Sequence, residues 1–202
     1  MKYPSLVMAS LLALGSGQAM ATVTGSIWVG DPTGASDATP GNVPLTPPDV
    51  TFTAPTPLDF ASGPLYTIGE FLSSGGATVL TNDVPLSDTL DNSIINFAGM
   101  VTVTNLESFT VGHDDGLTLV IDGTTVVNAP LPTSLVTTAY TWGGASGTYA
   151  FQLVYGECCG PPADLQVSLP LSAKVPEPAT LSLFGLGLVL VGFGFTRRRR
   201  AS

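Results

Sequence analysis

Basic residues are missing from most of this chain. All six lysines and arginines of the 202 residues lie at positions 2, 174 and 197–200, whereas 14 of the 15 acidic residues lie within residues 22–173. Nucleic-acid binding is excluded, because it depends on neutralising phosphates. Most of the carboxylates are expected to form a solvated acidic surface. A few are expected to take divalent cations, of which Ca²⁺ is the usual oxygen-bound example, as their counter-charge.

Metal-binding and nucleophilic side chains are also scarce. His113 is the only histidine, and Cys158 and Cys159 are the only cysteines. A zinc site is therefore not expected, since it needs more Cys or His ligands. The sequence patterns of serine hydrolases, zinc peptidases and phosphate-binding loops are absent as well. We expect no enzymatic function; catalysis by paired carboxylates is the weakest alternative.

The two adjacent cysteines leave three alternatives open. In an oxidising location outside the cytoplasm they can form a vicinal disulfide, stay as free thiols or bridge two chains. A bond between sequence neighbours closes a strained ring, so it is an uncommon way to staple a fold. We expect Cys158 and Cys159 to be bonded to each other, because no third cysteine competes within the chain.

Long amphipathic helical patterns are missing from the middle of the chain, whereas Gly (23 residues) and Pro (17 residues) are frequent. Short apolar runs between turn residues are typical of an all-β domain. We expect strands at residues 65–72, 77–80, 94–104 and 107–111. Residues 65–170 should form the core of a β-sandwich. Residues 22–64, rich in Pro, Gly, Thr and Asp, should be mostly loop with one or two strands.

Residues 112–123 carry the most informative local pattern. Two Asp-Gly pairs, at 115–116 and 122–123, flank the apolar run Leu117–Ile121. Asp-Gly favours tight turns because Gly adopts positive φ freely and Asp tolerates it. The run between them is therefore expected to be a buried strand. Asp114 and Asp115 precede this strand, and neighbours on a regular strand point to opposite faces, so they can share a ligand only where the backbone is irregular.

This pattern resembles the central motif of the PA14 domain family. In that motif a strand ends in Asp-Asp-Gly and is followed by a short apolar strand, Asp-Gly, and later a Gly-aromatic strand with Tyr-x-Glu. Here the matching segments are residues 109–123 and 147–157, and residues 163–169 correspond to the last strand. The resemblance covers residues 93–169 and implies an antiparallel β-sandwich.

The resemblance also implies a metal site. In the sugar-binding branch of the family, two adjacent Asp residues joined by a cis peptide coordinate Ca²⁺, and the ion holds carbohydrate hydroxyls. This places Ca²⁺ at Asp114 and Asp115, beside a loop at residues 157–162 in which Glu157 is a candidate ligand-binding residue. The alternative is that both Asp side chains serve only the turn before the strand.

Two aromatic residues are further candidates for sugar contact. Tyr140 and Trp142 lie beside two glycines, an arrangement that suits a stacking platform for a sugar ring. The alternative, which we favour, is that they close an edge of the core. His113, alone at a strand end, is expected to be structural.

The N-terminal residues 1–21 have the organisation of a secretory signal peptide. Lys2 supplies a positive start, residues 6–14 an apolar core, and Ala19-Met20-Ala21 a small-residue cleavage site. We expect the mature chain to begin at Thr22.

The C-terminal tail has three parts. A linker at residues 171–178 is followed by an uncharged apolar run at 179–196 and a basic end at 197–202. Eighteen residues at about 1.5 Å each span roughly 27 Å, just sufficient for a transmembrane helix. The basic end is expected to stay cytoplasmic, with the domain outside. The residues that define the tail are Val175, Pro176, Glu177, Pro178, Arg197, Arg198, Arg199 and Arg200.

The order of these parts closely resembles the PEP-CTERM sorting signal of Gram-negative bacteria. The resemblance implies a transient inner-membrane anchor, processing by an exosortase and delivery to the cell surface or an exopolysaccharide matrix. A plain membrane anchor would explain the apolar run and the arginines, but not Pro-Glu-Pro.

Together these observations predict an exported cell-surface or matrix protein that binds extracellular polysaccharide with the help of Ca²⁺. A structural matrix protein without a ligand site is the first alternative. A glycosidase that uses two carboxylates is the second.

Overall fold

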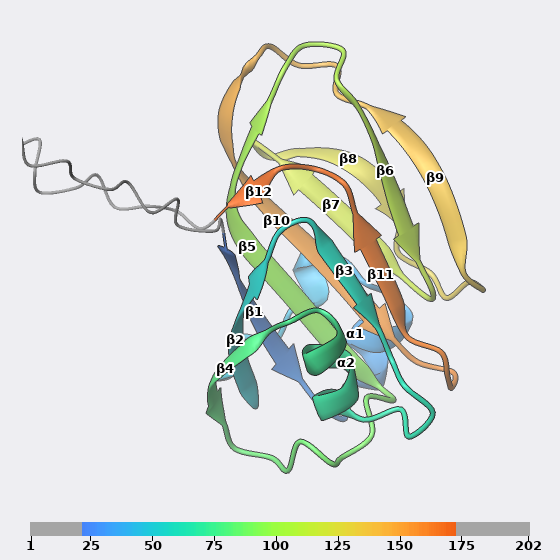
Figure 1. The fold of residues 1–202 in the computed structure, drawn as a ribbon. Coiled ribbons are helices and arrows are strands. Elements are labelled where there is room, and N and C mark those ends of the chain that lie inside the picture. The colour runs from blue at the N-terminus through green and yellow to red at the C-terminus, as the bar shows by residue number, and fades with distance from the viewer. Residues whose placement is uncertain (1–21, 173–202) are drawn as a thin grey trace, which may run out of the picture.

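The computed structural model describes residues 22–172 (Figure 1). The predicted signal peptide (residues 1–21), the Val-Pro-Glu-Pro motif, the transmembrane helix at 179–196 and the four arginines lie outside the described residues. Among residues 22–172, no helix is long and apolar enough to cross a membrane.

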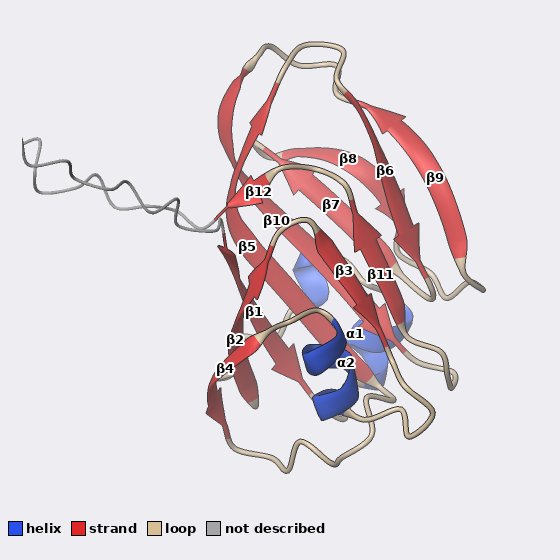
Figure 2. Ribbon diagram, viewed as in Figure 1, coloured by secondary structure: helices blue, strands red, loops and turns tan. Residues whose placement is uncertain are grey.

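Strands dominate the described chain (Figure 2). The strands are β1 (Thr22–Trp28), β2 (Val50–Pro55), β3 (Leu58–Ala61), β4 (Thr78–Asn82), β5 (Ser93–Val103), β6 (Ser108–His113), β7 (Leu117–Ile121), β8 (Thr124–Ala129), β9 (Val136–Thr141), β10 (Gly147–Glu157), β11 (Asp164–Val167) and β12 (Leu171–Ser172). The helices are α1 (Pro32–Ser36), the 3₁₀ turn η1 (Pro40–Asn42) and α2 (Ile68–Ser74).

The strands form two antiparallel sheets. The larger sheet has the order β4-β2-β1-β5-β10-β7-β8, with β12 paired to β5, and the smaller sheet has the order β3-β11-β6-β9. Their apolar faces share one continuous core. The predicted all-β antiparallel sandwich is therefore confirmed.

An aromatic cluster joins the two sheets. Phe52 on β2 and Phe97 on β5 come from the larger sheet, and their ring centroids lie 5.5 Å apart. Phe60 on β3 comes from the smaller sheet and lies 5.5 Å from Phe97 and 4.8 Å from Phe71 of α2. All four rings are fully buried. Since aromatic side chains bury large areas, this cluster is a main contribution to the packing of sheet against sheet.

Most predicted strands are confirmed, but one is wrong. The strand predicted at residues 65–72 is not found, and these residues contain the start of α2 instead. Thr67 caps this helix, with its Oγ1 accepting the N–H of Glu70 at 3.2 Å, and Glu70 lies in the first turn. Thr-x-x-Glu is a capping-box pattern, and the buried Ile68, Phe71 and Leu72 repeat with helical spacing.

Residues 22–64 are more ordered than their composition predicts. They form three strands in place of one or two, and β1 lies in the larger sheet between β2 and β5. In β2 buried and half-buried positions alternate regularly, as a strand with one face in the core requires. Thr and Pro in this segment hide the alternation, because Thr suits both strands and loops.

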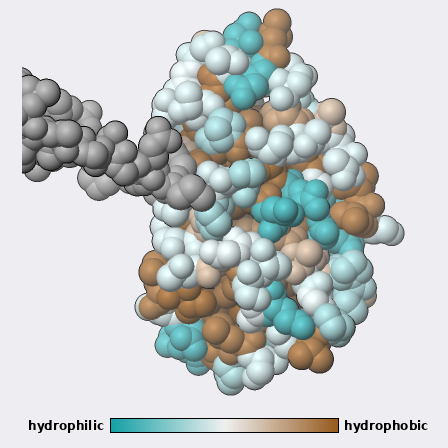
Figure 3. Space-filling view, viewed as in Figure 1, coloured by the Kyte–Doolittle hydropathy of each residue, from teal (hydrophilic) through white to brown (hydrophobic). Residues whose placement is uncertain are grey.

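The surface mixes polar and apolar residues. On the face drawn in Figure 3, hydrophobic and hydrophilic residues are interspersed. The exposed large apolar side chains include Leu131, Leu135 and Val136, which lie in and just after the loop between β8 and β9. This loop borders the cavity described below.

Loss of the Phe60 ring should strongly destabilise the domain. We expect Phe60→Ala to lower the free energy of unfolding by about 3–5 kcal/mol, because the ring contacts both sheets and α2 and its loss leaves a cavity. Denaturant unfolding of the exported protein measures this. The matched control Leu45→Ala, at a fully exposed position, should change it by less than about 0.5 kcal/mol.

Candidate functional site

Three loops meet at one end of the sandwich and enclose a cavity of about 410 Å³. Its walls are Asp114 and Asp115 between β6 and β7, residues 132–134 between β8 and β9, and residues 159–162 after β10. The two acidic residues singled out from the sequence thus lie in one cavity together with the loop that follows Glu157.

An irregular backbone makes this arrangement possible. Asp115 has φ of 61°, in the left-handed region that L-residues seldom adopt. The N–H of Asp114 donates to the carbonyl of Asp164 at 3.0 Å, and the N–H of Asp115 donates to the carbonyl of Thr133 at 2.7 Å. These bonds hold the chain in a turn, so that two neighbouring side chains reach the same space.

The cis peptide implied by the PA14 resemblance is not found. Among the described residues, the cis bonds are Thr56–Pro57 and Pro161–Pro162, so the bond between Asp114 and Asp115 is trans. The left-handed conformation of Asp115 brings the side chains together instead.

A glycine lets the neighbouring loop close over this turn. A Cβ at Gly116 would lie 2.1 Å from the carbonyl oxygen of Pro130, so no larger residue fits without moving the loop. The same Gly116 accepts a hydrogen bond from the N–H of Gly156 on β10 at 2.9 Å. The Asp-Asp-Gly turn is therefore fixed to both walls of the cavity.

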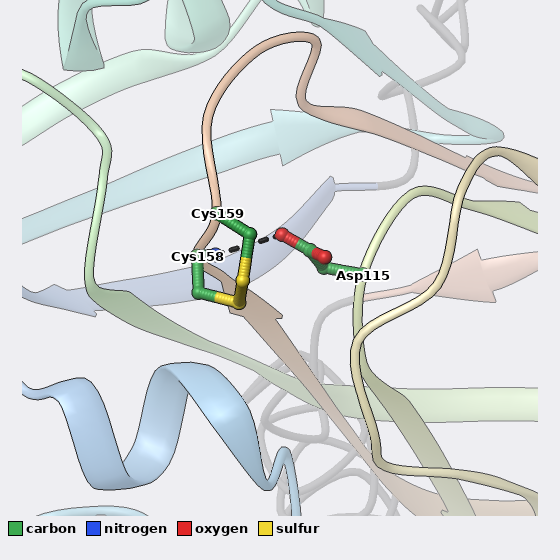
Figure 4. Close-up of side chains that lie close together, drawn as sticks. All are labelled: Asp115, Cys158 and Cys159. Atoms are coloured by element: carbon green, nitrogen blue, oxygen red, sulfur yellow. Dashed lines mark hydrogen bonds between the residues drawn. A yellow bond between two sulfur atoms is a disulfide. The ribbon is translucent and has the colours of Figure 1, made fainter.

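Asp114 and Asp115 are both largely buried, with 9% and 5% of their surface exposed. Oδ1 of Asp114 accepts the N–H of Asp115 at 3.1 Å, and Oδ2 of Asp115 accepts the N–H of Cys158 at 2.8 Å (Figure 4). Burial raises the pKa of both carboxyl groups above the usual Asp range, while these backbone hydrogen bonds act in the opposite direction. A bound cation would offset that cost of burial.

Glu157 lies behind the cavity wall and is fully buried. Its carboxyl group accepts hydrogen bonds from the hydroxyls of Tyr66, at 2.5 Å, and Tyr155. Burial raises its pKa to about 8, and the charges of Asp115 and Asp114 act in the same direction. Glu157 is not among the residues that line the cavity, but the charge of Asp115 contributes to the raised pKa of Glu157.

Cys158 and Cys159 form a vicinal disulfide beside Asp115 (Figure 4). Cys158 is buried, whereas Cys159 is exposed and lines the cavity. His113 also supports this corner, with Nδ1 lying 2.7 Å from the carbonyl oxygen of Asp115.

Tyr140 and Trp142 lie away from the cavity. Tyr140 pairs with Phe109 at the far end of β6, and their rings stack with centroids 5.9 Å apart. Trp142 is buried, packs against Tyr149 and donates its indole N–H to the carbonyl of Ala145 at 2.8 Å. It borders a separate cavity of about 390 Å³. The structure therefore does not bring these aromatic residues to Asp114 and Asp115.

The sequence interpretation missed Asp164. Its Oδ1 is buried without a hydrogen-bond partner, and its backbone carbonyl holds Asp114. Burial raises its pKa, and the charges of Asp59 and Asp114 add to the shift. Only the three-dimensional pairing of β11 with β6 places Asp164 near Asp114, so no local sequence signal could have indicated it.

The donor set suits Ca²⁺. Asp114 and Asp115 offer carboxylate oxygens, and Thr133 and Ser134 in the same cavity wall carry hydroxyl and carbonyl oxygens. Ca²⁺ takes six to eight such oxygens in flexible geometry. Within the described residues there is no Lys or Arg to neutralise the carboxylates. A hard dication therefore fits the residues that are present.

Comparison with solved structures shows a PA14-type fold. The chain is similar to the PA14 domain of the antifreeze protein MpAFP, with a TM-score of 0.54, 20% identity and coverage of 87% of this chain and 90% of that one. It also matches a PA14 sugar-binding domain from an RTX adhesin, with a TM-score of 0.49, 16% identity and coverage of 74% and 88%. The comparison with curated proteins finds no matching sequence.

The tail identifies how the protein is sorted. Residues 174–200 match the PEP-CTERM protein-sorting motif. The protein is therefore an exported protein with a C-terminal sorting signal, and its described part has a PA14-like sandwich fold.

Replacing Glu157 by a side chain that does not titrate should change how the free energy of unfolding depends on pH. Its pKa is about 8 in the folded protein and near its ordinary value of 4.5 when unfolded. Between these values the folded state holds a proton that the unfolded state releases, so stability falls as pH rises, by up to about 1.4 kcal/mol per pH unit. In Glu157→Gln the fall between pH 5 and 8 should largely disappear.

Urea unfolding in chelator at several pH values measures this dependence. Leu45→Ala, at a fully exposed position without a titratable group, is the control and should keep the slope of the parent protein. An identical slope in the Glu157→Gln variant would show that Glu157 is already ionised in the folded state.

Proposed function

We propose that the exported domain is a Ca²⁺-assisted carbohydrate-binding module through which the protein adheres to extracellular polysaccharide. The observation that carries the proposal is the placement of Asp114 and Asp115, both largely buried, in one cavity of about 410 Å³ without any basic residue in the domain.

The charge of the two Asp residues supports a bound cation. Two largely desolvated carboxylates side by side repel each other, and a buried charge needs a partner. Their backbone donors, Asp115 N–H and Cys158 N–H, are neutral groups, so they do not neutralise the negative charge of either carboxylate. Bound Ca²⁺ would supply the missing positive charge.

The cavity walls also suit a sugar as the ligand. When bound, Ca²⁺ supplies open coordination positions for neutral oxygens, and the hydroxyl pairs of a sugar provide such oxygens. The remaining walls contribute hydroxyl groups of Thr133 and Ser134 and the apolar surfaces of the prolines at 132, 161 and 162. This mixture of polar donors and apolar contacts suits a polyhydroxylated ligand better than a charged one.

The sorting signal in the tail supports the same function. A PEP-CTERM signal marks the protein for export, where processing by an exosortase at the inner membrane would release it to the cell surface or the polysaccharide matrix. A binding module for that polysaccharide would act at the place to which the tail delivers it. In the alternative of a purely structural matrix protein, the two carboxylates would serve only as acceptors for the backbone N–H groups of Asp115 and Cys158.

Calcium should stabilise the domain through the two Asp residues. A ligand that binds only the folded state adds about 2.7 kcal/mol at a hundredfold excess over Kd, so millimolar Ca²⁺ should raise the Tm of the exported protein by roughly 5–10 °C. In Asp114→Asn and Asp115→Asn the gain should vanish while the fold is retained. The measurement is thermal unfolding followed by circular dichroism, with Ca²⁺ and then with chelator.

Asp122→Asn is the matched control, because Asp122 lies in the other Asp-Gly turn and outside the cavity. It should keep the full calcium response. A glycan array run with and without Ca²⁺ then tests the carbohydrate part. Equal Tm values with Ca²⁺ and chelator would exclude the metal site, and calcium-independent glycan binding would exclude its role in recognition.

The sorting motif should control release from the inner membrane. Replacing Pro176, Glu177 and Pro178 by Ala removes the feature that distinguishes this tail from a plain anchor. We expect the variant to accumulate in the inner-membrane fraction, whereas the parent protein reaches the surface or the medium. Cell fractionation with immunoblotting measures this, and unchanged surface delivery would favour a simple membrane anchor.

A further inference from the structure

Three potential metal ligands lie together at one corner of the cavity, and two of them are sulfur atoms, unlike the oxygen ligands of the calcium site. A carboxylate oxygen of Asp115 and the Sγ atoms of Cys158 and Cys159 all lie within 4.8 Å of one another (Figure 4). In the disulfide the sulfur atoms are weak ligands, because the thiolate is the form that binds metal ions. The cluster therefore holds no soft-metal site in the oxidised protein.

We propose that reduction of the Cys158–Cys159 bond converts this corner into a binding site for a thiophilic divalent cation of the zinc group. A dithiol reductant would supply two electrons and two protons, breaking the S–S bond and becoming a disulfide itself. The two new thiols lose their protons to solvent when the cation binds. The ligands are then two thiolates and the Asp115 carboxylate.

The three groups stay close after the bond opens. The Cα atoms of the two cysteines are 3.8 Å apart as sequence neighbours, and Cys158 is buried at the end of β10. Its N–H is held by Oδ2 of Asp115 at 2.8 Å, a bond that does not involve sulfur. Two prolines at 161 and 162 restrict the chain beyond Gly160. The cluster is thus positioned by the fold and not only by the disulfide.

The distances suit a small tetrahedral ion. With Zn–S near 2.3 Å and Zn–O near 2.1 Å, the ligand atoms of a tetrahedral site lie roughly 3.5–3.8 Å apart. The carboxylate oxygen and the two Sγ atoms lie within 4.8 Å of one another, and the Sγ atoms, 2.18 Å apart in the disulfide, can separate toward that range once the bond is broken. The fourth position can be taken by water, because Cys159 and Asp115 both line the cavity.

Access and selectivity follow from the same geometry. The exposed Cys159 lets a dithiol reach the bond from the cavity. Zinc-group ions prefer thiolates, whereas Ca²⁺ takes oxygens only. The reduced site would hold two thiolates and one carboxylate. Because the domain has no basic residue, the bound cation would be the source of positive charge. The redox state of one bond would then decide which class of cation this corner accepts.

Cadmium is the probe, because its thiolate complexes show an ultraviolet charge-transfer band. The exported protein is reduced with dithiothreitol, freed of it anaerobically and titrated with Cd²⁺. We expect one Cd²⁺ per chain in the reduced protein and no band in the oxidised protein. Cys158→Ser and Cys159→Ser should each weaken binding by at least about tenfold, and Asp115→Asn should weaken it about tenfold while keeping the band.

Two variants separate this site from the calcium site. Asp114→Asn should abolish the calcium response and leave Cd²⁺ binding unchanged, because Asp114 is not part of the cluster. The double variant Cys158→Ser, Cys159→Ser should abolish Cd²⁺ binding and leave the calcium response unchanged. Asp122→Asn should leave both unchanged.

The proposal is overturned if the reduced protein shows no charge-transfer band, or if the serine variants bind Cd²⁺ as tightly as the parent. Near-ultraviolet circular dichroism reports whether the reduced domain stays folded. If it unfolds, Cd²⁺ should restore the folded signal in the parent and not in the serine variants, and failure to restore it also overturns the proposal.

Discussion

The pairing of β5 with β10 is the interaction on which the rest of the structure depends. Eleven residues of each strand pair in continuous antiparallel register, from Gly147 opposite Val103 to Glu157 opposite Ser93. Because β10 also pairs with β7, the end of β10 is fixed beside the turn that precedes Leu117. The register therefore decides that Glu157, the cysteines and the two Asp residues meet at one end of the sandwich. A shift of one residue would send each side chain to the opposite face of the sheet.

The site shows how a domain without basic residues manages buried carboxylates. Burial raises the pKa of Glu157 to about 8 and the neighbouring Asp charges add to the rise, whereas the hydrogen bonds from the two tyrosine hydroxyls lower it. Asp114 and Asp115 rely on backbone N–H donors. The two sites therefore differ in their donors, because the deeper carboxyl group has hydroxyl donors and the pair at the cavity wall has backbone N–H donors.

Much of this could be predicted from the sequence, and what could not has physical causes. The strand Leu117–Ile121 follows from its two Asp-Gly turns, whereas the backbone at Asp115 is irregular through a positive φ and not through the cis peptide that the resemblance implies. Helix α2 contradicts the predicted strand, although its cap and spacing are visible at Thr67 and Glu70. The position of Asp164 near Asp114 depends on a pairing between strands far apart in the chain, and so does the distance of Trp142 from the cavity. Local sequence patterns do not reveal such pairings.

The short strand β12 determines how tension would pass through the domain. It pairs with β5 at Met100 and Val101, and the tail follows directly after it, whereas the cavity lies at the other end of the β5–β10 ladder. A pull between a ligand in the cavity and the tail would act along these strands. Its load would fall first on the two residue pairs that join β12 to β5, because the tail continues from β12 and not from either strand of the eleven-pair β5–β10 ladder.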